Sequence, residues 1–168
     1  QALPVEILIL QHSRETAHAK NTARLVSLTV SNARIISGTY NDIVNEIGGN
    51  TDRRCAVIYP GDKSTPIEAT ASEERQSVNT LIFLDGSWRQ AFALWQTNAW
   101  LHSLPQFHFE TPPESAYSIR HTDFAQSLST LEAVAYSVNH LTGYNTAFLH
   151  RLQTARIASW QSPSHHRR

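Results

Sequence analysis

The sequence has one cysteine, no long apolar run and no net charge, and each of these scarcities argues against a class of protein. Cys55 alone cannot form an internal disulfide or a cysteine-rich zinc site, and it fits a reducing compartment, so we expect a cytoplasmic protein. No apolar run approaches the about 20 residues of a membrane-spanning helix, so no membrane association is expected. The formal net charge is zero, whereas nucleic-acid-binding proteins are typically positive overall. Binding to nucleic acid would therefore require a local basic surface. The chain begins with Gln1, directly before an apolar segment, and we expect it to be part of a longer protein.

Several familiar catalytic and binding motifs are also missing. Neither the dinucleotide-binding G-x-G-x-x-G pattern nor the P-loop pattern occurs. Ser87 does not lie in the G-x-S-x-G pattern of a hydrolase nucleophile, and it stands where an aspartate-nucleophile phosphatase needs a second Asp after Asp85. Nine histidines occur without H-E-x-x-H or related carboxylate spacing, so no metal is predicted.

The patterns that are present predict one α/β domain over residues 1–160, followed by a flexible polar tail at 161–168. Apolar runs predict strands at 5–10, 34–37, 55–59 and 81–84, and shorter extended pieces at 107–109 and 117–120. Helical spacing predicts helices at about 21–31, 42–47, 88–95, 129–141 and 146–160, with Leu25, Val26 and Leu28 as buried positions of the first. Residues 63–79 are polar, and one irregular helical turn is expected there. The alternation of strands and helices predicts a mostly parallel sheet with helices on both faces.

The most informative segment joins a strand to a helix through Asp85. Four apolar residues at 81–84 predict a buried strand, and Gly86 permits the turn that ends it. Ser87 and Gln90 form a capping-box pattern that starts the next helix. Asp85 is therefore expected at the carboxyl edge of the sheet, beside a helix N-terminus, where open α/β sheets bind ligands. Taken alone, an Asp-Gly pair after a strand more often only stabilises its turn.

Other polar segments follow predicted strands in the same way. They lie at 11–15 and 59–62, and a second capping box formed by Ser129 and Glu132 starts a further helix. Because the carboxyl ends of parallel strands share one edge, these segments predict a composite pocket there.

In combination, five segments resemble the DTW-domain family of tRNA-uridine aminocarboxypropyltransferases. Each motif alone is weak, but their joint order is specific, and the similarity runs from Ile7 to about Leu141. The segments are LQHSRE (10–15), NTARL (21–25), YPG (59–61), LDGSWRQA (84–91) and LSTLEA (128–133).

The resemblance implies a SPOUT-like fold with a C-terminal knot that holds S-adenosylmethionine as co-substrate. It implies transfer of the 3-amino-3-carboxypropyl group to N3 of a tRNA uridine, with release of methylthioadenosine. Asp85 would be the catalytic base or the acceptor that orients the uridine. The residues expected to hold S-adenosylmethionine are Tyr59, Pro60, Gly61, Leu84, Gly86, Ser87, Trp88, Ser129, Thr130 and Leu131. The residues expected to contact tRNA are Arg14, Lys20, Arg24, Arg89 and Arg120.

The sequence departs from the family pattern at several points. Ser87 replaces Thr in the D-x-T-W signature, and Ser13 and Ala19 stand where Pro is common. The stretch 115–120 has fewer arginines than usual, and the cysteine-rich segment that precedes many family members is absent. Two alternatives therefore stay open, namely a SPOUT-like RNA methyltransferase and a non-catalytic RNA-binding module. Trp88 could stack on a base or pack in the core, and Arg24 or Arg89 could pair with a neighbouring acid.

Overall fold

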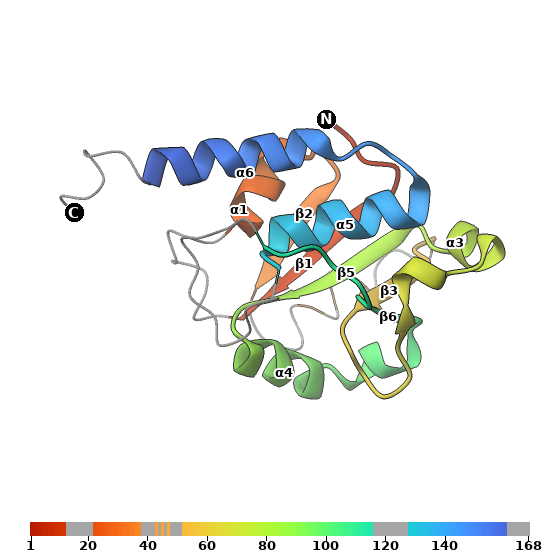
Figure 1. Ribbon diagram of the computed structural model, residues 1–168. Helices are drawn as coiled ribbons and strands as arrows, with labels where there is room; N and C mark the ends of the chain where they lie inside the picture. The colour runs from red at the N-terminus through yellow and green to blue at the C-terminus, as the bar shows by residue number, and fades with distance from the viewer. Residues whose placement is uncertain are drawn as a thin grey trace.

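Six parallel strands form one sheet in the computed structural model, in the order β2-β1-β5-β3-β6-β4 (Figure 1). The structure describes residues 1–12, 22–37, 43, 45, 47, 52–115 and 128–160. The strands are β1 (Glu6–Gln11), β2 (Ala33–Ser37), β3 (Cys55–Ile58), β4 (Thr65–Pro66), β5 (Thr80–Asp85) and β6 (Gln106–His108). The prediction of a mostly parallel α/β sheet is confirmed.

Strands β1 and β5 lie side by side in the middle of the sheet. Their register pairs Glu6 with Thr80 at one end and Gln11 with Asp85 at the other. Between these polar ends, both strands are continuous apolar runs, as is usual for parallel strands that helices cover on both faces. All three polar segments that follow β1, β3 and β5 therefore start from the same edge of the sheet.

The helices cover the two faces of the sheet in separate layers (Figure 1). One layer contains α1 (Ala23–Thr29), α5 (Thr130–Thr142) and α6 (Ala147–Trp160). The other contains α4 (Trp88–Thr97) and the 3₁₀ helix η3 (Ala99–Ser103). Because side chains alternate along a strand, Ile7 and Ile9 pack with the first layer, whereas Leu8 and Leu10 pack with the second. The prediction of helices on both faces is confirmed.

Both predicted capping boxes are present. At the start of α4, the Gln90 N–H donates to Ser87 Oγ at 3.2 Å, and the Ser87 N–H donates to Gln90 Oε1 at 2.8 Å. At the start of α5, the Glu132 N–H donates to Ser129 Oγ at 3.1 Å, and the Ser129 N–H donates to Glu132 Oε1 at 2.9 Å. These bonds satisfy N–H groups that a helix leaves without partners, so both helices begin at fixed points beside the sheet edge.

The structure corrects two expectations from the sequence. Residues 63–79 contain more order than one helical turn, since they form β4, the 3₁₀ helix η2 (Ile67–Ala69) and the helix α3 (Ser72–Ser77). Leu28, predicted to be buried, is 73% exposed, because α1 buries Ala23 and Val26 on its inner side. The predicted extended piece at 117–120 and the tail at 161–168 lie outside the described residues. None of the helices in the described ranges combines the length and apolar character that crossing a membrane requires.

Candidate active site

Asp85 ends β5 at the carboxyl edge of the sheet and is only 5% exposed. Gln11, at the same level of β1, donates from Nε2 to Asp85 Oδ2 at 3.1 Å. The hydroxyl of Thr130, the first residue of α5, donates to Asp85 Oδ1. Two segments far apart in the sequence therefore hold the carboxylate in one orientation. The sequence analysis included Gln11 in the polar segment 11–15 expected at the pocket but assigned it no role.

The N-terminus of α5 is tied to two other helices at this point. The Leu131 N–H donates to Thr22 Oγ1 just before α1, at 3.1 Å. Ser129 Oγ donates to Gln153 Oε1 of α6 at 2.6 Å, and Gln153 Nε2 donates to Glu132 Oε2 at 3.1 Å. Gln153 is buried and was missed by the sequence analysis, because no local pattern connects it with Ser129. Hydrogen bonds to Thr22 before α1 and to Gln153 of α6 thus fix the residues on either side of Thr130.

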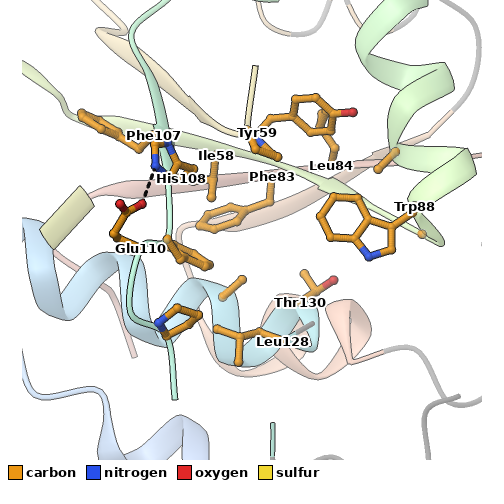
Figure 2. Close-up of a pocket in the computed structure, with 16 residues that line it drawn as sticks. Ile58, Tyr59, Phe83, Leu84, Trp88, Phe107, His108, Glu110, Leu128 and Thr130 are labelled. Atoms are coloured by element: carbon orange, nitrogen blue, oxygen red, sulfur yellow. Dashed lines mark hydrogen bonds and ion pairs between the residues drawn. The ribbon is translucent and has the colours of Figure 1, made fainter. Parts of the chain in front are cut away.

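A pocket of about 410 Å³ opens beside these groups (Figure 2). Its lining is mainly apolar and comes from the ends of β3, β5 and β6, from α4, and from the start of α5. Asp85 does not itself line the pocket, but its chain neighbours Leu84 and Gly86 do, and so does its hydrogen-bond donor Thr130. Of the ten residues expected to hold S-adenosylmethionine, six line this pocket: Tyr59, Pro60, Leu84, Gly86, Trp88 and Thr130.

The other four residues of that set lie next to the lining and shape it. Ser87 and Ser129 cap the two helices, and Leu131, the second residue of α5, is fully buried. Gly61 has no room for a side chain, since a Cβ there would lie 2.5 Å from Gln106 Oε1 and 2.8 Å from Trp95 Cζ2. The glycine therefore allows the chain after Pro60 to pass close to α4 and β6.

Two aromatic side chains of the lining differ in their surroundings. The Tyr59 ring stacks on Trp95 of α4, with ring centroids 4.8 Å apart. Burial raises the pKa of Tyr59, so its phenol stays neutral at ordinary pH. Trp88 is 43% exposed and lines the pocket, so it is not a core residue.

The end of β6 adds polar residues that the sequence analysis did not predict. His108 and Glu110 both line the pocket, and His108 Nε2 lies 3.0 Å from Glu110 Oε2. A half-buried carboxylate fixes the backbone at this end: Glu68 accepts hydrogen bonds from the Tyr136 hydroxyl and from the backbone N–H groups of Glu110 and Thr111. Burial raises the pKa of Glu68, but these hydrogen bonds outweigh it and lower that pKa to about 2. The extended piece predicted at 107–109 corresponds to β6, but no motif assigned a role to the polar residues at its carboxyl end.

The residues expected to contact tRNA are only partly described. Arg24 lies exposed on α1 and Arg89 lies exposed on α4, next to Trp88. Neither lines the pocket. Arg14, Lys20 and Arg120 lie outside the described residues. In the part of the chain that the structure describes, no group of three or more His, Cys, Asp or Glu side chains gathers where it could hold a metal ion.

Comparison with curated proteins gives relatives that share one name. The tRNA-uridine aminocarboxypropyltransferase 2 of Drosophila melanogaster is 28% identical over 141 residues, which are 80% of this chain and 55% of that protein. The protein of the same name from Mus musculus is 30% identical over 94 residues, which are 56% of this chain and 32% of that protein. The one from Macaca fascicularis is 29% identical over 89 residues, or 53% of this chain and 30% of that protein. The chain therefore spans at most about half the length of these relatives.

No solved structure matches the chain. A family model described as DTW domain matches residues 1–156. That range includes all six strands, both capped helices, Asp85 and the pocket beside it. By this match, the chain belongs to the DTW domain family.

Proposed function

We propose that this chain transfers the 3-amino-3-carboxypropyl group of S-adenosylmethionine to N3 of a uridine in tRNA and releases methylthioadenosine. The observation that carries the proposal is the buried carboxylate of Asp85, linked by the Thr130 hydroxyl to an apolar pocket of about 410 Å³. This volume lies in the range of small-molecule sites. The names of the relatives describe an aminocarboxypropyl transfer to tRNA uridine.

The reaction needs a proton acceptor more than it needs activation of the donor. The carbon next to a sulfonium is already electrophilic, whereas uridine N3 carries a proton and becomes a good nucleophile only when that proton leaves. In the transfer, a bond forms between N3 and the terminal carbon of the aminocarboxypropyl group. The bond from that carbon to sulfur breaks, and sulfur keeps the electron pair as methylthioadenosine forms.

The hydrogen bonds around Asp85 suggest a path for the proton. Because Thr130 lines the pocket and donates to Asp85, we assign the path from N3 to Thr130 Oγ1 and on to Asp85 Oδ1. The Thr130 hydroxyl would accept the N3 proton as it passes its own to the carboxylate. Gln11 would fix the second oxygen, Oδ2, and so keep Oδ1 directed at Thr130.

The apolar lining suits the nucleoside part of S-adenosylmethionine. The side chains of Tyr59, Leu84 and Trp88 offer the contact surface that an adenine ring and a methylthio group require. Ser87, Ser129, Gly61 and Leu131 would act indirectly, by fixing the helix starts and the loop after β3. We further propose that the chain is threaded as a SPOUT-like knot, on the family resemblance alone.

The tRNA would approach the carboxyl edge of the sheet, where α1 and α4 begin on opposite faces and where Arg24 and Arg89 offer cations to phosphates. Arg14, Lys20 and Arg120 complete the set proposed from the sequence. Phosphate contacts of this kind weaken as salt increases. Binding of tRNA that does not depend on salt would remove these residues from the proposal.

The test is incubation of the chain with S-adenosylmethionine and unmodified tRNA, followed by mass spectrometry of the tRNA nucleosides and of the small-molecule product. We expect aminocarboxypropyl-uridine and methylthioadenosine. S-Adenosylhomocysteine with a methylated nucleoside would instead establish a methyltransferase. Binding of tRNA without either product would favour an RNA-binding module. Asp85→Asn, which keeps the shape of the side chain, is the matched negative control.

A further inference from the structure

One end of the pocket is formed by residues at and after the carboxyl end of β6. It carries the carboxylate of Glu110, which the proposed proton path does not use. Among the described residues that line the pocket, Glu110 brings the one carboxylate. Figure 2 shows Glu110 and His108 on one side of the pocket and Trp88 and Thr130 on the other. The pocket therefore has an acidic end, defined by His108 and Glu110, that lies away from the end where Thr130 reaches Asp85.

The backbone of the acidic end is anchored from behind. The Glu110 N–H lies 3.1 and 3.0 Å from the two Glu68 oxygens, and the Thr111 N–H donates to Glu68 Oε2 at 3.0 Å. Glu68 also accepts from the Tyr136 hydroxyl of α5 at 2.6 Å. These charge-assisted hydrogen bonds fix the backbone of Glu110 relative to α5, whose first residue is Thr130.

The side chain of Glu110 is oriented by His108. A carboxylate only accepts hydrogen bonds, so His108 donates from Nε2 to Glu110 Oε2 across 3.0 Å. On the other side of the ring, His108 Nδ1 lies 2.8 Å from Ser64 Oγ, and Ser64 Oγ lies 2.9 Å from the Gly61 carbonyl oxygen. The ring is therefore held between the loop after β3 and Glu110.

One oxygen of Glu110 remains available to a ligand. Within the described ranges, no hydrogen bond reaches Glu110 Oε1, and the side chain is 63% exposed at the pocket. A carboxylate held in this way selects a ligand that donates hydrogen bonds from neighbouring atoms, and two adjacent hydroxyl groups meet that need. The transferred group of the donor carries an ammonium, but this group must lie near Thr130, at the opposite end of the pocket.

We propose that Glu110, positioned by His108, accepts hydrogen bonds from the ribose hydroxyl groups of the donor nucleoside. The inference rests on the proposed function, since it names how the donor of that reaction is recognised. With the ribose at the acidic end, the sulfonium and the reacting carbon point toward Thr130 and Asp85. Glu110 is then the residue that distinguishes a ribonucleoside from its deoxy counterpart.

The test measures binding of methylthioadenosine and of 2′-deoxy-methylthioadenosine by calorimetry, because both lack the ammonium. We expect Glu110→Ala to weaken methylthioadenosine binding about tenfold or more, as loss of a charge-assisted hydrogen bond does. The deoxy compound should bind the unaltered chain weakly and lose little further affinity in Glu110→Ala. Glu114→Gln, an exposed change on the same segment that does not line the pocket, should bind both compounds like the unaltered chain.

The role of His108 is tested by combining variants. If His108 acts through Glu110, then His108→Ala should weaken methylthioadenosine binding in the unaltered chain but not in Glu110→Ala. Equal effects in both backgrounds would remove the positioning role and leave His108 as a separate contact.

Several outcomes would overturn the inference. They are equal weakening of both nucleosides by Glu110→Ala, no weakening of either, or weakening of S-adenosylmethionine binding alone, which would assign Glu110 to the ammonium. In each of these cases the unaltered chain would still release methylthioadenosine, and the proposed function would stand. A chain that binds neither nucleoside and releases no methylthioadenosine would end both proposals together.

Discussion

The two ends of the β1 and β5 pair each hold a carboxylate, and the two are held in different ways. At the amino edge, Glu6 accepts from Arg53 Nε at 2.7 Å and from a second guanidinium nitrogen at 3.0 Å. Thr80, paired with Glu6 in the register, adds its hydroxyl at 3.3 Å. At the carboxyl edge, Asp85 accepts from the Gln11 amide and the Thr130 hydroxyl.

The difference separates a structural carboxylate from a candidate catalytic one. The hydrogen bond from Arg53 lowers the pKa of Glu6 against the opposing effect of burial, so Glu6 holds its charge and binds protons poorly. Arg53 also donates to the Ile47 carbonyl, so the ion pair joins β1 to the segment before β3. Asp85 is instead bound to a hydroxyl that lines the pocket, which gives its carboxylate a route to a ligand. Under the proposed function, the same two strands carry a stabilising ion pair at one end and the catalytic carboxylate at the other.

The largest effect we expect is on turnover by Asp85→Asn. The amide keeps the size of the side chain but removes the proton acceptor, so kcat should fall roughly 10²- to 10⁴-fold. The melting temperature and the affinity for tRNA should change little. Glu6→Gln, the same change at the other end of the strands, should leave kcat near the unaltered value. If the two variants lost turnover equally, the separation of the two edges would be wrong.

A smaller effect on turnover is expected at Thr130. Removing its hydroxyl in Thr130→Val interrupts the proposed proton path, and kcat should fall roughly 10- to 100-fold, within the range known for positioned proton-transfer groups. Thr130→Ser keeps the hydroxyl and should retain most of the turnover. Single-turnover measurement of methylthioadenosine release compares the two variants directly. Similar losses in Val and Ser variants would assign the role of Thr130 to packing.

The next effect is on stability at the amino edge. Glu6→Gln leaves the Arg53 guanidinium, whose side chain is 8% exposed, without its carboxylate, and this should cost about 1 to 3 kcal/mol of unfolding free energy. Urea denaturation followed by circular dichroism measures the change. Glu73→Gln, an exposed change on α3, is the control and should have a much smaller effect. A loss of turnover with unchanged stability in Glu6→Gln would reverse the roles assigned to the two edges.

The sequence predicted the carboxyl edge well because its signals are local. An apolar run, a glycine and a capping box within ten residues fix β5, Asp85 and the start of α4. The second capping box likewise fixes the start of α5, and so the place of Thr130. Parallel pairing then follows from the alternation of strands and helices, which brings these ends together.

The parts that the sequence did not predict depend on contacts between distant residues. Glu6 and Arg53 are 47 positions apart, and no sequence pattern around either residue indicates that they form an ion pair. Gln153 of α6 meets Ser129 only because α5 and α6 pack together. The acidic end of the pocket follows the extended piece predicted at 107–109, which is β6 in the structure, but no sequence motif indicated that His108 and Glu110 would meet there. Leu28 was wrongly predicted to be buried. Helical spacing shows which side of α1 is apolar, but it does not show how much of that side the rest of the protein covers.

The smallest effect we expect is on stability at low pH, through Glu68, which binds the backbone N–H groups of Glu110 and Thr111. The pKa of Glu68 is lowered in the folded chain to about 2 from an ordinary value of 4.5, so ionised Glu68 contributes stability above about pH 4.5. That contribution is lost as the pH falls from about 4.5 toward 2. Glu68→Gln should therefore be less stable than the unaltered chain at pH 7, and the difference should shrink as the pH falls through this window. Thermal unfolding at a series of pH values measures the difference, with Glu73→Gln as the control. A difference that grew toward low pH would mean that Glu68 is held as a neutral acid, and that the backbone of Glu110 is fixed by something other than its charge.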